Sequence, residues 1–211
     1  NSWSVFLDSS IFIQSIETYL NDMNNPEEII VIDIGGWVGF TSKPIIESLQ
    51  YKSIKAQYHT IDISEEMIQK NKRHLSSILD AEGHLLDIEQ GGIRSKIKEI
   101  KNRNPNIPIL VTILWSTIGN FPEARALLRQ IESALWLIDR IIVGTQIYHE
   151  WQESQITKIY NNDESAIRML NATINSLWIQ IDGNYNFRWN TRETMIEWGI
   201  TLNKDTILNI W

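Results

Sequence analysis

Short apolar runs rich in Ile and Val alternate along the chain with longer segments whose apolar residues recur at helical spacing. The short runs predict strands at Glu28–Ile34, Gln57–Ile61, Gly83–Leu86, Ile109–Leu114 and Arg140–Gln146. Strands that alternate with helices are typical of βαβ units, in which neighbouring strands run parallel. The pattern therefore predicts an α/β fold with a mostly parallel central sheet.

The amphipathic segments predict one helix before the first strand and one after each of the first four strands. These helices are expected at Val5–Leu20, 42–49, Ser64–Leu79, Ile93–Asn102 and Phe121–Leu135. Asn120, Pro122 and Glu123 supply a cap, a first-turn proline and a capping acid for the last of them. Each helix would return the chain to the starting edge of the sheet, as parallel pairing requires.

The segment after residue 150 follows a different pattern, with a polar helix followed by alternating apolar and polar residues. The alternating stretches are Leu177–Ile181, Phe187–Trp189, Met195–Ile200 and Thr206–Ile210. Gly183-Asn184 and Asn203-Lys204 are the expected turns. We therefore expect a C-terminal antiparallel hairpin beside the parallel sheet.

Composition narrows the class of protein. At 211 residues with 43% hydrophobic content, the chain can bury one sizeable core, so we expect a single domain. A formal net charge of -7 argues against nucleic acid and anionic membranes as partners. No cysteine is present, which excludes disulfides, thiol catalysis and Cys-ligated metal centres. The longest apolar run, Ile109–Trp115, is too short to span a bilayer, and we expect a cytoplasmic protein.

The residues after the first strand are candidates for ligand binding, because ligands of open α/β sheets lie beyond the carboxyl ends of the strands. The chain reads Asp33-Ile34-Gly35-Gly36-Trp37-Val38-Gly39 there. Gly35, Gly36 and Gly39 allow a tight turn and close approach of a ligand, and Asp33 could bind an amino group. The alternative is a strand-to-helix turn with no ligand.

Acids also follow the second and third strands. Asp62-Ile63 stands at the second tip, where an acid can bind both hydroxyls of a ribose, and Asp87-Ile88 stands at the third, where an acid can accept from an adenine amino group. Both acids could instead cap the next turn or helix. Three acids at successive tips beside a glycine turn favour a nucleoside that carries an amino acid.

The tip of the fourth strand offers polar groups at the edge where a substrate would meet such a cofactor. Ser116 and Thr117 carry hydroxyls, and Asn120 carries an amide. Trp115 precedes them, and its ring, like that of Trp37, could stack on a ligand. His149 lies just past the fifth strand and is a weaker candidate for the site edge.

Three segments together resemble a known family, the histidine Nα-methyltransferases of ergothioneine biosynthesis and the related dimethylallyltryptophan N-methyltransferases. These segments are Asp33-Ile34-Gly35, Tyr58–Glu66 and above all Ser116-Thr117-Ile118-Gly119-Asn120-Phe121. Ile196-Glu197-Trp198 looks like the family's late substrate-binding strand. The resemblance implies a Rossmann-like class I methyltransferase fold and S-adenosyl-L-methionine as the cofactor.

The resemblance runs from about residue 28 to the end of the chain. Within a single methyltransferase domain, we expect residues 1–27 to form an N-terminal helix, residues 28–150 the cofactor-binding core, and residues 151–211 the C-terminal helix and antiparallel strands. The residues implied to bind the cofactor are Asp33, Gly35, Gly36, Trp37, Gly39, Asp62, Ile63, Asp87, Ile88 and Trp115. Those implied to bind the small-molecule substrate are Ser116, Thr117, Asn120, Glu197 and His149.

Methyl transfer from a sulfonium requires no dedicated base, so no catalytic residue is assigned. No histidine spacing predicts a metal site, and His74 and His84 look like surface or packing residues. One alternative is a catalytically idle methyltransferase-like domain in a larger polypeptide, motivated by Trp37 in the turn and by Asn1 in place of an initiator Met. A weaker alternative is an NAD-dependent oxidoreductase, although the third glycine of G-x-G-x-x-G is absent.

Overall fold

The structure is a computed structural model, and it describes residues 3–114, 117–144, 153–162, 164, 167–168, 183–190 and 195–202. The chain forms two compact units, residues 1–146 and residues 147–211. Each unit is described by itself below.

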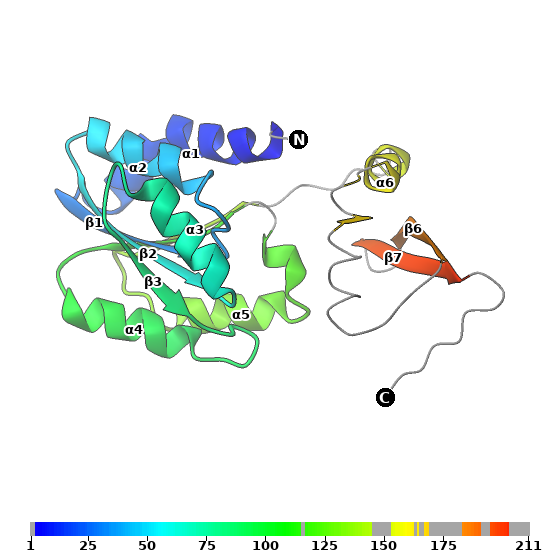
Figure 1. Ribbon diagram of the computed structural model, residues 1–211. Coiled ribbons are helices and arrows are strands. Elements are labelled where there is room, and N and C mark those ends of the chain that lie inside the picture. Colours follow the sequence, from blue (N-terminus) through cyan, green and yellow to red (C-terminus); the bar gives the residue numbers. More distant parts are fainter. Residues whose placement is uncertain are drawn as a thin grey trace. The chain divides into compact units, whose positions relative to one another are not determined.

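The first unit contains a five-stranded parallel sheet (Figure 1). Its strands are β1 (Glu28–Ile34), β2 (Lys55–Asp62), β3 (Ala81–Leu85), β4 (Ile109–Ile113) and β5 (Arg140–Val143). They lie in the order β3-β2-β1-β4-β5. The predicted α/β fold with a parallel central sheet is therefore confirmed, and the order is that of a doubly wound, Rossmann-like sheet.

Helices cover both faces of this sheet (Figure 1). α1 (Trp3–Asp22), α2 (Ser42–Tyr51) and α3 (Glu65–Leu75) pack on one face, and α4 (Ile93–Arg103) and α5 (Ala124–Glu132) pack on the other. Two separate apolar clusters result, one on each side of the sheet. The three layers explain why β1 and β4 read as continuous apolar runs, since both faces of these two strands are buried.

Successive residues of β1 point alternately into the two clusters. Ile29 and Val31 belong to the cluster under α1 and α2, whereas Ile30, Ile32 and Ile34 belong to the cluster over α4 and α5. All five side chains are at most 1% exposed. Burying one such side chain stabilises a fold by roughly 1.5–3 kcal/mol, so β1 is the strand on which both cores depend.

A buried ion pair joins α4 to the loop before β5. Lys101 Nζ lies 2.9 Å from Asp139 Oδ1, and neither side chain is more than 1% exposed. Asp139 Oδ1 also accepts from the backbone N–H of Ile109 (2.8 Å), and its Oδ2 accepts from that of Trp136 (2.7 Å). The carboxylate therefore holds together the starting ends of β4 and β5.

Two predicted helices are longer than the observed ones. α3 ends at Leu75, not at Leu79, because the chain turns there and the N–H groups of Ile78 and Leu79 both bond to the Leu75 carbonyl. Ile78 and Leu79 in this turn still pack on the core, so the helical spacing of apolar residues in the sequence continues beyond the end of the helix. α5 begins at Ala124 and ends at Glu132, and a separate short 3₁₀ helix, η1 (Thr117–Asn120), precedes it.

The second unit contains α6 (Glu153–Asn161), β6 (Gly183–Asn190) and β7 (Met195–Leu202). β6 and β7 form a separate two-stranded antiparallel sheet. Gly183 and Asn184 were expected in a turn but begin β6, because they pair with Leu202 and Thr201. The stretches 177–181 and 206–210 and the turn Asn203-Lys204 lie outside the described residues.

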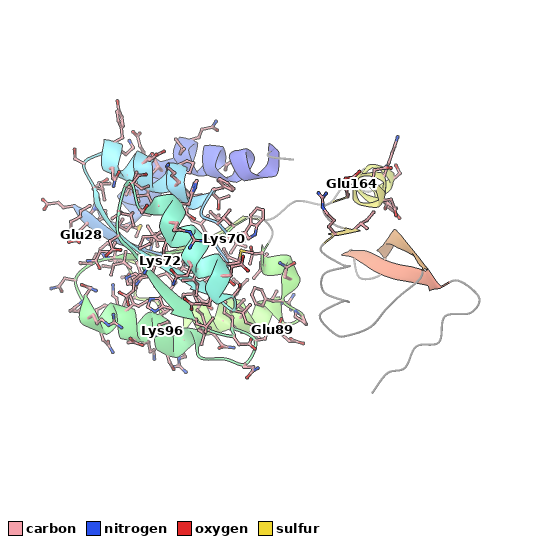
Figure 2. All side chains as sticks on the ribbon, viewed as in Figure 1. Glu28, Lys70, Lys72, Glu89, Lys96 and Glu164 are labelled. Atoms are coloured by element: carbon pink, nitrogen blue, oxygen red, sulfur yellow. The ribbon has the colours of Figure 1, made fainter. Side chains whose placement is uncertain are left out.

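Charged side chains cover the outer surface of the first unit (Figure 2). Lys70 on α3 pairs with Glu66 at 2.7 Å, and Lys96 on α4 pairs with Glu99 at 2.6 Å. Cations on these two helices are thus interspersed with acids. None of the helices in the described part of the chain is long and apolar enough to cross a bilayer.

Candidate functional site

The carboxyl ends of β1 and β4 lie side by side, and the chain leaves them toward opposite faces of the sheet. From β1 it runs to α2 on one face, and from β4 it runs through η1 to α5 on the other. Such a reversal of strand order opens a crevice at the strand tips, and that is where ligands of open α/β sheets bind.

The glycine turn after β1 lies against the loop after β4. Gly35 has φ +64°, a conformation that L-residues seldom adopt, and a Cβ built on it would lie 2.6 Å from Thr117 Cγ2. Glycine is therefore required at Gly35 for two reasons, the backbone angle and the contact with Thr117. The structure thus brings together Gly35 and Thr117, which the sequence assigned to cofactor and substrate.

Trp37 stands in the same turn and also has a positive φ, +48°. Its side chain is 41% exposed, so the indole lies at the surface of the turn and not in the core. Phe40, three residues later, is 52% exposed and contacts the His74 ring edge-on at 4.7 Å. The segment from Gly35 to Phe40 therefore combines three glycines with two aromatic side chains that are exposed to solvent.

The carboxylate of Asp33 lies beneath this turn and is fully buried. Three hydroxyl groups donate to it, each from a different element. Thr112 Oγ1 on β4 donates to Oδ1 (2.9 Å), and Tyr58 Oη on β2 (2.7 Å) and Ser42 Oγ on α2 donate to Oδ2. Asp33 therefore holds β1, β2, β4 and α2 at one point, and within the described residues its carboxylate faces these hydroxyls and not solvent.

Asn71 on α3 extends this network to the turn. Its Nδ2 donates to the Gly36 carbonyl (3.4 Å) and to the Tyr58 hydroxyl (3.1 Å). Because that carbonyl can only accept, the contact fixes which end of the amide faces the turn. A Cβ on Gly36 would lie 2.1 Å from Asp33 Oδ2, so only glycine lets the turn rest directly on the carboxylate.

Burial and charge set the protonation of this network. Desolvation raises the pKa of Asp33 above its ordinary value of 3.8, the three hydroxyl bonds oppose that shift, and the nearby charge of Asp62 adds to it. Burial, reinforced by the negative charge of Asp33, raises the pKa of Tyr58 well above 10. Tyr58 therefore keeps its proton and remains a donor to Asp33.

Asp62 ends β2 and is half buried. Its Oδ1 accepts from the backbone N–H of Ser64 (2.8 Å), and Ser64 Oγ in turn accepts from Met67 N (3.3 Å) and caps α3. Among the described residues, only backbone N–H groups bond to the Asp62 carboxylate. Ser64, and not Asp62, is therefore the N-cap of α3. Ile63 lies between these two residues, and its side chain is 65% exposed.

Asp87 follows β3 and serves a local turn in this structure. Its Oδ1 accepts from the N–H groups of Glu89 (3.1 Å) and Gln90 (3.4 Å), and its Oδ2 accepts from Gln90 Nε2 (2.8 Å). Ile88 is 8% exposed and packs in the core cluster of α4 and α5. Asp87 thus stabilises a local turn and does not cap α4, whose N-cap is Gly92, and a role toward adenine stays a prediction.

The remaining predicted residues are placed unequally. Asn120 ends η1, is exposed, and does not cap α5, which begins four residues later. Trp115, Ser116 and His149 lie outside the described residues. Glu197 lies on β7 of the second unit, opposite Arg188, and only its backbone is described.

Sequence analysis missed the residues that hold the turn in place: Ser42, Tyr58, Asn71 and Thr112. The only available signal was a hydroxyl within a buried parallel strand, as with Thr112 in the run Ile109–Leu114. A buried hydroxyl requires a hydrogen-bond partner, and the preceding acid of β1 is the strongest acceptor nearby.

The amino-acid sequence matches the family described as "Histidine-specific methyltransferase, SAM-dependent" over residues 11–208. This chain belongs to that family. The resemblance inferred from the Ser116–Phe121 and Tyr58–Glu66 motifs is therefore confirmed, and S-adenosylmethionine is the cofactor of the family. The match favours this cofactor over the NAD considered from strand order.

Solved structures with a related fold include several methyltransferases. They are the trans-methyltransferase CalH in complex with SAH (15% identity, TM-score 0.47, 60% of this chain and 34% of that one), the DszA carbon methyltransferase (17%, 0.41, 60% and 32%) and the CMeT domain of the citrinin polyketide synthase (14%, 0.47, 91% and 52%). The aligned part of this chain spans between a third and about half of their lengths. Comparison with curated proteins finds no match.

The residues at the strand tips fit the cofactor of this methyltransferase family. The glycine turn presents backbone beside Thr117, with no side chain at Gly35 between the two segments. The Asp62 carboxylate is engaged by backbone N–H groups alone among the described residues, and it can accept from ribose hydroxyls. These two features lie on the adjacent strands β1 and β2.

Proposed function

We propose that this chain transfers a methyl group from S-adenosylmethionine to the nitrogen of an amino acid or a related small amine. One observation carries the proposal: in a member of this family, the glycine turn contacts Thr117 of the family motif at the point where strand order reverses. That contact joins the segment proposed for the cofactor to the segment proposed for the substrate.

The proposed cofactor residues occupy the tips of β1, β2, β3 and β4. Gly35, Gly36, Trp37 and Gly39 would approach the amino-acid end, Asp62 and Ile63 the ribose, and Asp87 and Ile88 the adenine, with Trp115 lining the site. Asp33 would act from beneath, because its carboxylate is sealed and supports the backbone of Gly36. We regard it as a positioning residue.

The proposed substrate residues are Ser116, Thr117, Asn120, His149 and Glu197. Asn120 is exposed at the end of η1, and its amide could bind the amino and carboxylate groups of an amino acid. Glu197 would bind the side chain of the substrate.

In this reaction the task of the chain is to position the substrate amine and the cofactor. The cofactor supplies a methyl group on a positively charged sulfur, whose departure needs no proton. The chain has to bind the amine in its neutral form, align the nitrogen lone pair with the methyl carbon and exclude water from the contact. Aromatic groups such as Trp37 suit the last task, because they cover a ligand without competing for its hydrogen bonds.

The two compact units would together form one methyltransferase domain. The family match supports this arrangement, since it covers residues 11–208 and so includes both units. The net charge of -7 favours a small-molecule substrate over nucleic acid and agrees with a cytoplasmic protein.

A second candidate function is a catalytically idle domain that serves binding or assembly in a larger polypeptide. Trp37 motivates it, because a bulky residue with φ +48° stands in the turn that the cofactor would contact.

Titration calorimetry with S-adenosylhomocysteine separates the two functions. We expect micromolar binding by the wild type, loss of binding in Asp62→Ala and unchanged binding in Asp80→Ala, an exposed acid before β3. Transfer of a labelled methyl group to histidine and other amino acids would then identify the acceptor. A folded wild type that does not bind supports the idle domain and rejects the enzyme.

A further inference from the structure

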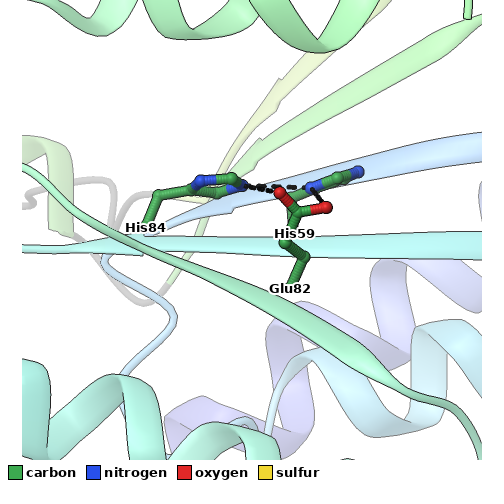
Figure 3. A group of neighbouring side chains, drawn as sticks. All are labelled: His59, Glu82 and His84. Atoms are coloured by element: carbon green, nitrogen blue, oxygen red, sulfur yellow. Dashed lines mark hydrogen bonds and ion pairs between the residues drawn. The ribbon is translucent and has the colours of Figure 1, made fainter. Parts of the chain in front are cut away.

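Two histidines and a glutamate gather on the α4 face of the sheet (Figure 3). His59 lies on β2, and Glu82 and His84 lie on the edge strand β3. The register pairs His59 with Glu82 and Ile61 with His84, and strand side chains alternate, so all three point to one face. Sequence analysis missed this cluster because its members come from two strands that pair only in the folded chain.

The distances within the cluster match those between ligands of a shared metal ion. His59 Nδ1 lies 3.1 Å from His84 Nε2, and each nitrogen lies 3.6 Å from a Glu82 carboxylate oxygen. A tetrahedral zinc ion with bonds of about 2.0–2.1 Å separates its ligand atoms by about 3.3 Å. The two ring nitrogens stand at close to that spacing, the two 3.6 Å contacts go to Oε2 and Oε1 of Glu82, and one ligand atom from each of the three residues lies within 4.8 Å of the others.

Hydrogen bonds alone do not account for this arrangement. One proton can bridge the two ring nitrogens, but 3.6 Å is too long for a hydrogen bond from either ring to the carboxylate. His59 Nε2 is buried and has no hydrogen-bond partner among the described residues, and the His59 ring stacks on that of His84 with ring centroids 5.3 Å apart.

Burial and access also suit a metal ion. His59 is 5% exposed and His84 is 8% exposed, which favours neutral rings with free lone pairs. The Glu82 side chain is 48% exposed, so an ion and a water molecule can enter from that side. Arg103 donates to Glu82 Oε1 at 3.1 Å, as the outer partner of a ligating carboxylate commonly does.

We propose that His59, Glu82 and His84 bind one divalent transition-metal ion, with zinc the best match, and that a water molecule completes its coordination. Imidazole and carboxylate are ligands that zinc accepts at these distances, whereas magnesium and calcium take oxygen ligands. The ion ties the edge strand β3 to β2 and stabilises the fold. The site does not depend on the proposed methyl transfer, because none of the residues proposed to bind the cofactor or the substrate belongs to it.

Metal titration of the untagged, chelator-treated protein tests the proposal. We expect one equivalent of Co²⁺ to give the intense visible absorption of a four-coordinate site, and Zn²⁺ to displace it. Zn²⁺ should also raise the melting temperature, since an ion that binds only the native state stabilises it. Absence of Co²⁺ absorption and of any Zn²⁺ heat in the folded wild type would overturn the proposal.

Variants locate the site. Glu82→Gln keeps the shape of a half-exposed side chain and should weaken Zn²⁺ binding tenfold or more, and His84→Gln should do the same. His74→Gln is the matched control, because His74 lies on α3 and outside the cluster, and its affinity for Zn²⁺ should equal that of the wild type. Equal affinity in Glu82→Gln and in the wild type would place the ion elsewhere and reject the assignment.

Discussion

The hydroxyl of Tyr58 donates to Asp33 Oδ2 at 2.7 Å, and both side chains are sealed from solvent at the end of the central strand. The same hydroxyl accepts from Asn71, whose amide also holds the Gly36 carbonyl. The position of the glycine turn is therefore set by buried polar contacts from three elements and not by the turn alone.

Tyr58→Phe should destabilise the protein by about 1–3 kcal/mol, since it leaves Asp33 and Asn71 each without one buried partner. Urea unfolding measures the loss. Tyr51→Phe is the control, because Tyr51 is 91% exposed and its stability should match that of the wild type. Equal stability of both variants would show that the Tyr58 contact contributes nothing.

Gly36→Ala should lose both stability and affinity for S-adenosylhomocysteine. The new methyl group would lie 2.1 Å from Asp33 Oδ2 and 2.7 Å from its Cγ, and such overpacking costs about 1–3 kcal/mol or more. Gly119→Ala provides a comparison, because nothing lies within 4 Å of its Cβ position. Thermal unfolding and calorimetry on both variants decide whether the turn requires glycine at Gly36.

The pH dependence of stability should carry a component from Asp33. Because burial raises the pKa of Asp33 in the native state above 3.8, the native state holds a proton that the unfolded state has released between these two values. Stability from this group therefore falls as pH rises through that window. Asp33→Asn removes the component, so wild-type stability minus variant stability should decrease with rising pH. A difference that is constant with pH would contradict the shift.

Removing one partner of the Lys101–Asp139 pair should cost about 3–5 kcal/mol, because it leaves the other charge buried. Lys101→Met and Asp139→Asn can both be measured by urea unfolding. Lys96→Met removes a cation from the same helix at a partly exposed pair and should leave unfolding unchanged. Similar losses in Lys101→Met and Lys96→Met would show that burial gives this pair no special weight.

Hydrophobic patterning predicted the central strands β1 and β4 most directly, because both are buried on both faces and read as apolar runs. The helix ends were harder to predict. Leu79 and Leu135 keep the helical spacing while they pack from turns, so the apolar pattern outlasts the hydrogen-bonded helix. The residues after β4 favour a cap at Asn120, but the chain first forms η1.

The strand-tip acids Asp33, Asp62 and Asp87 were found from sequence because strand ends were predicted correctly. Their different surroundings were not predicted, since a carboxylate's partners depend on elements distant in sequence. Thr112, for example, is 79 positions from Asp33. The His59 cluster was missed for the same reason, because only the register of β2 and β3 brings its side chains together.

The alternation of β1 has a consequence for how the sheet acquires its register. If β1 slipped by one residue, Asp33 would point into the aliphatic cluster over α4 and Ile34 would face three hydroxyl groups. Such a sheet would bury an unpaired carboxylate and could not seat Gly36 on Asp33. The polar contacts of Asp33 thus select the register of β1, because only the correct register places the glycine turn on its carboxylate.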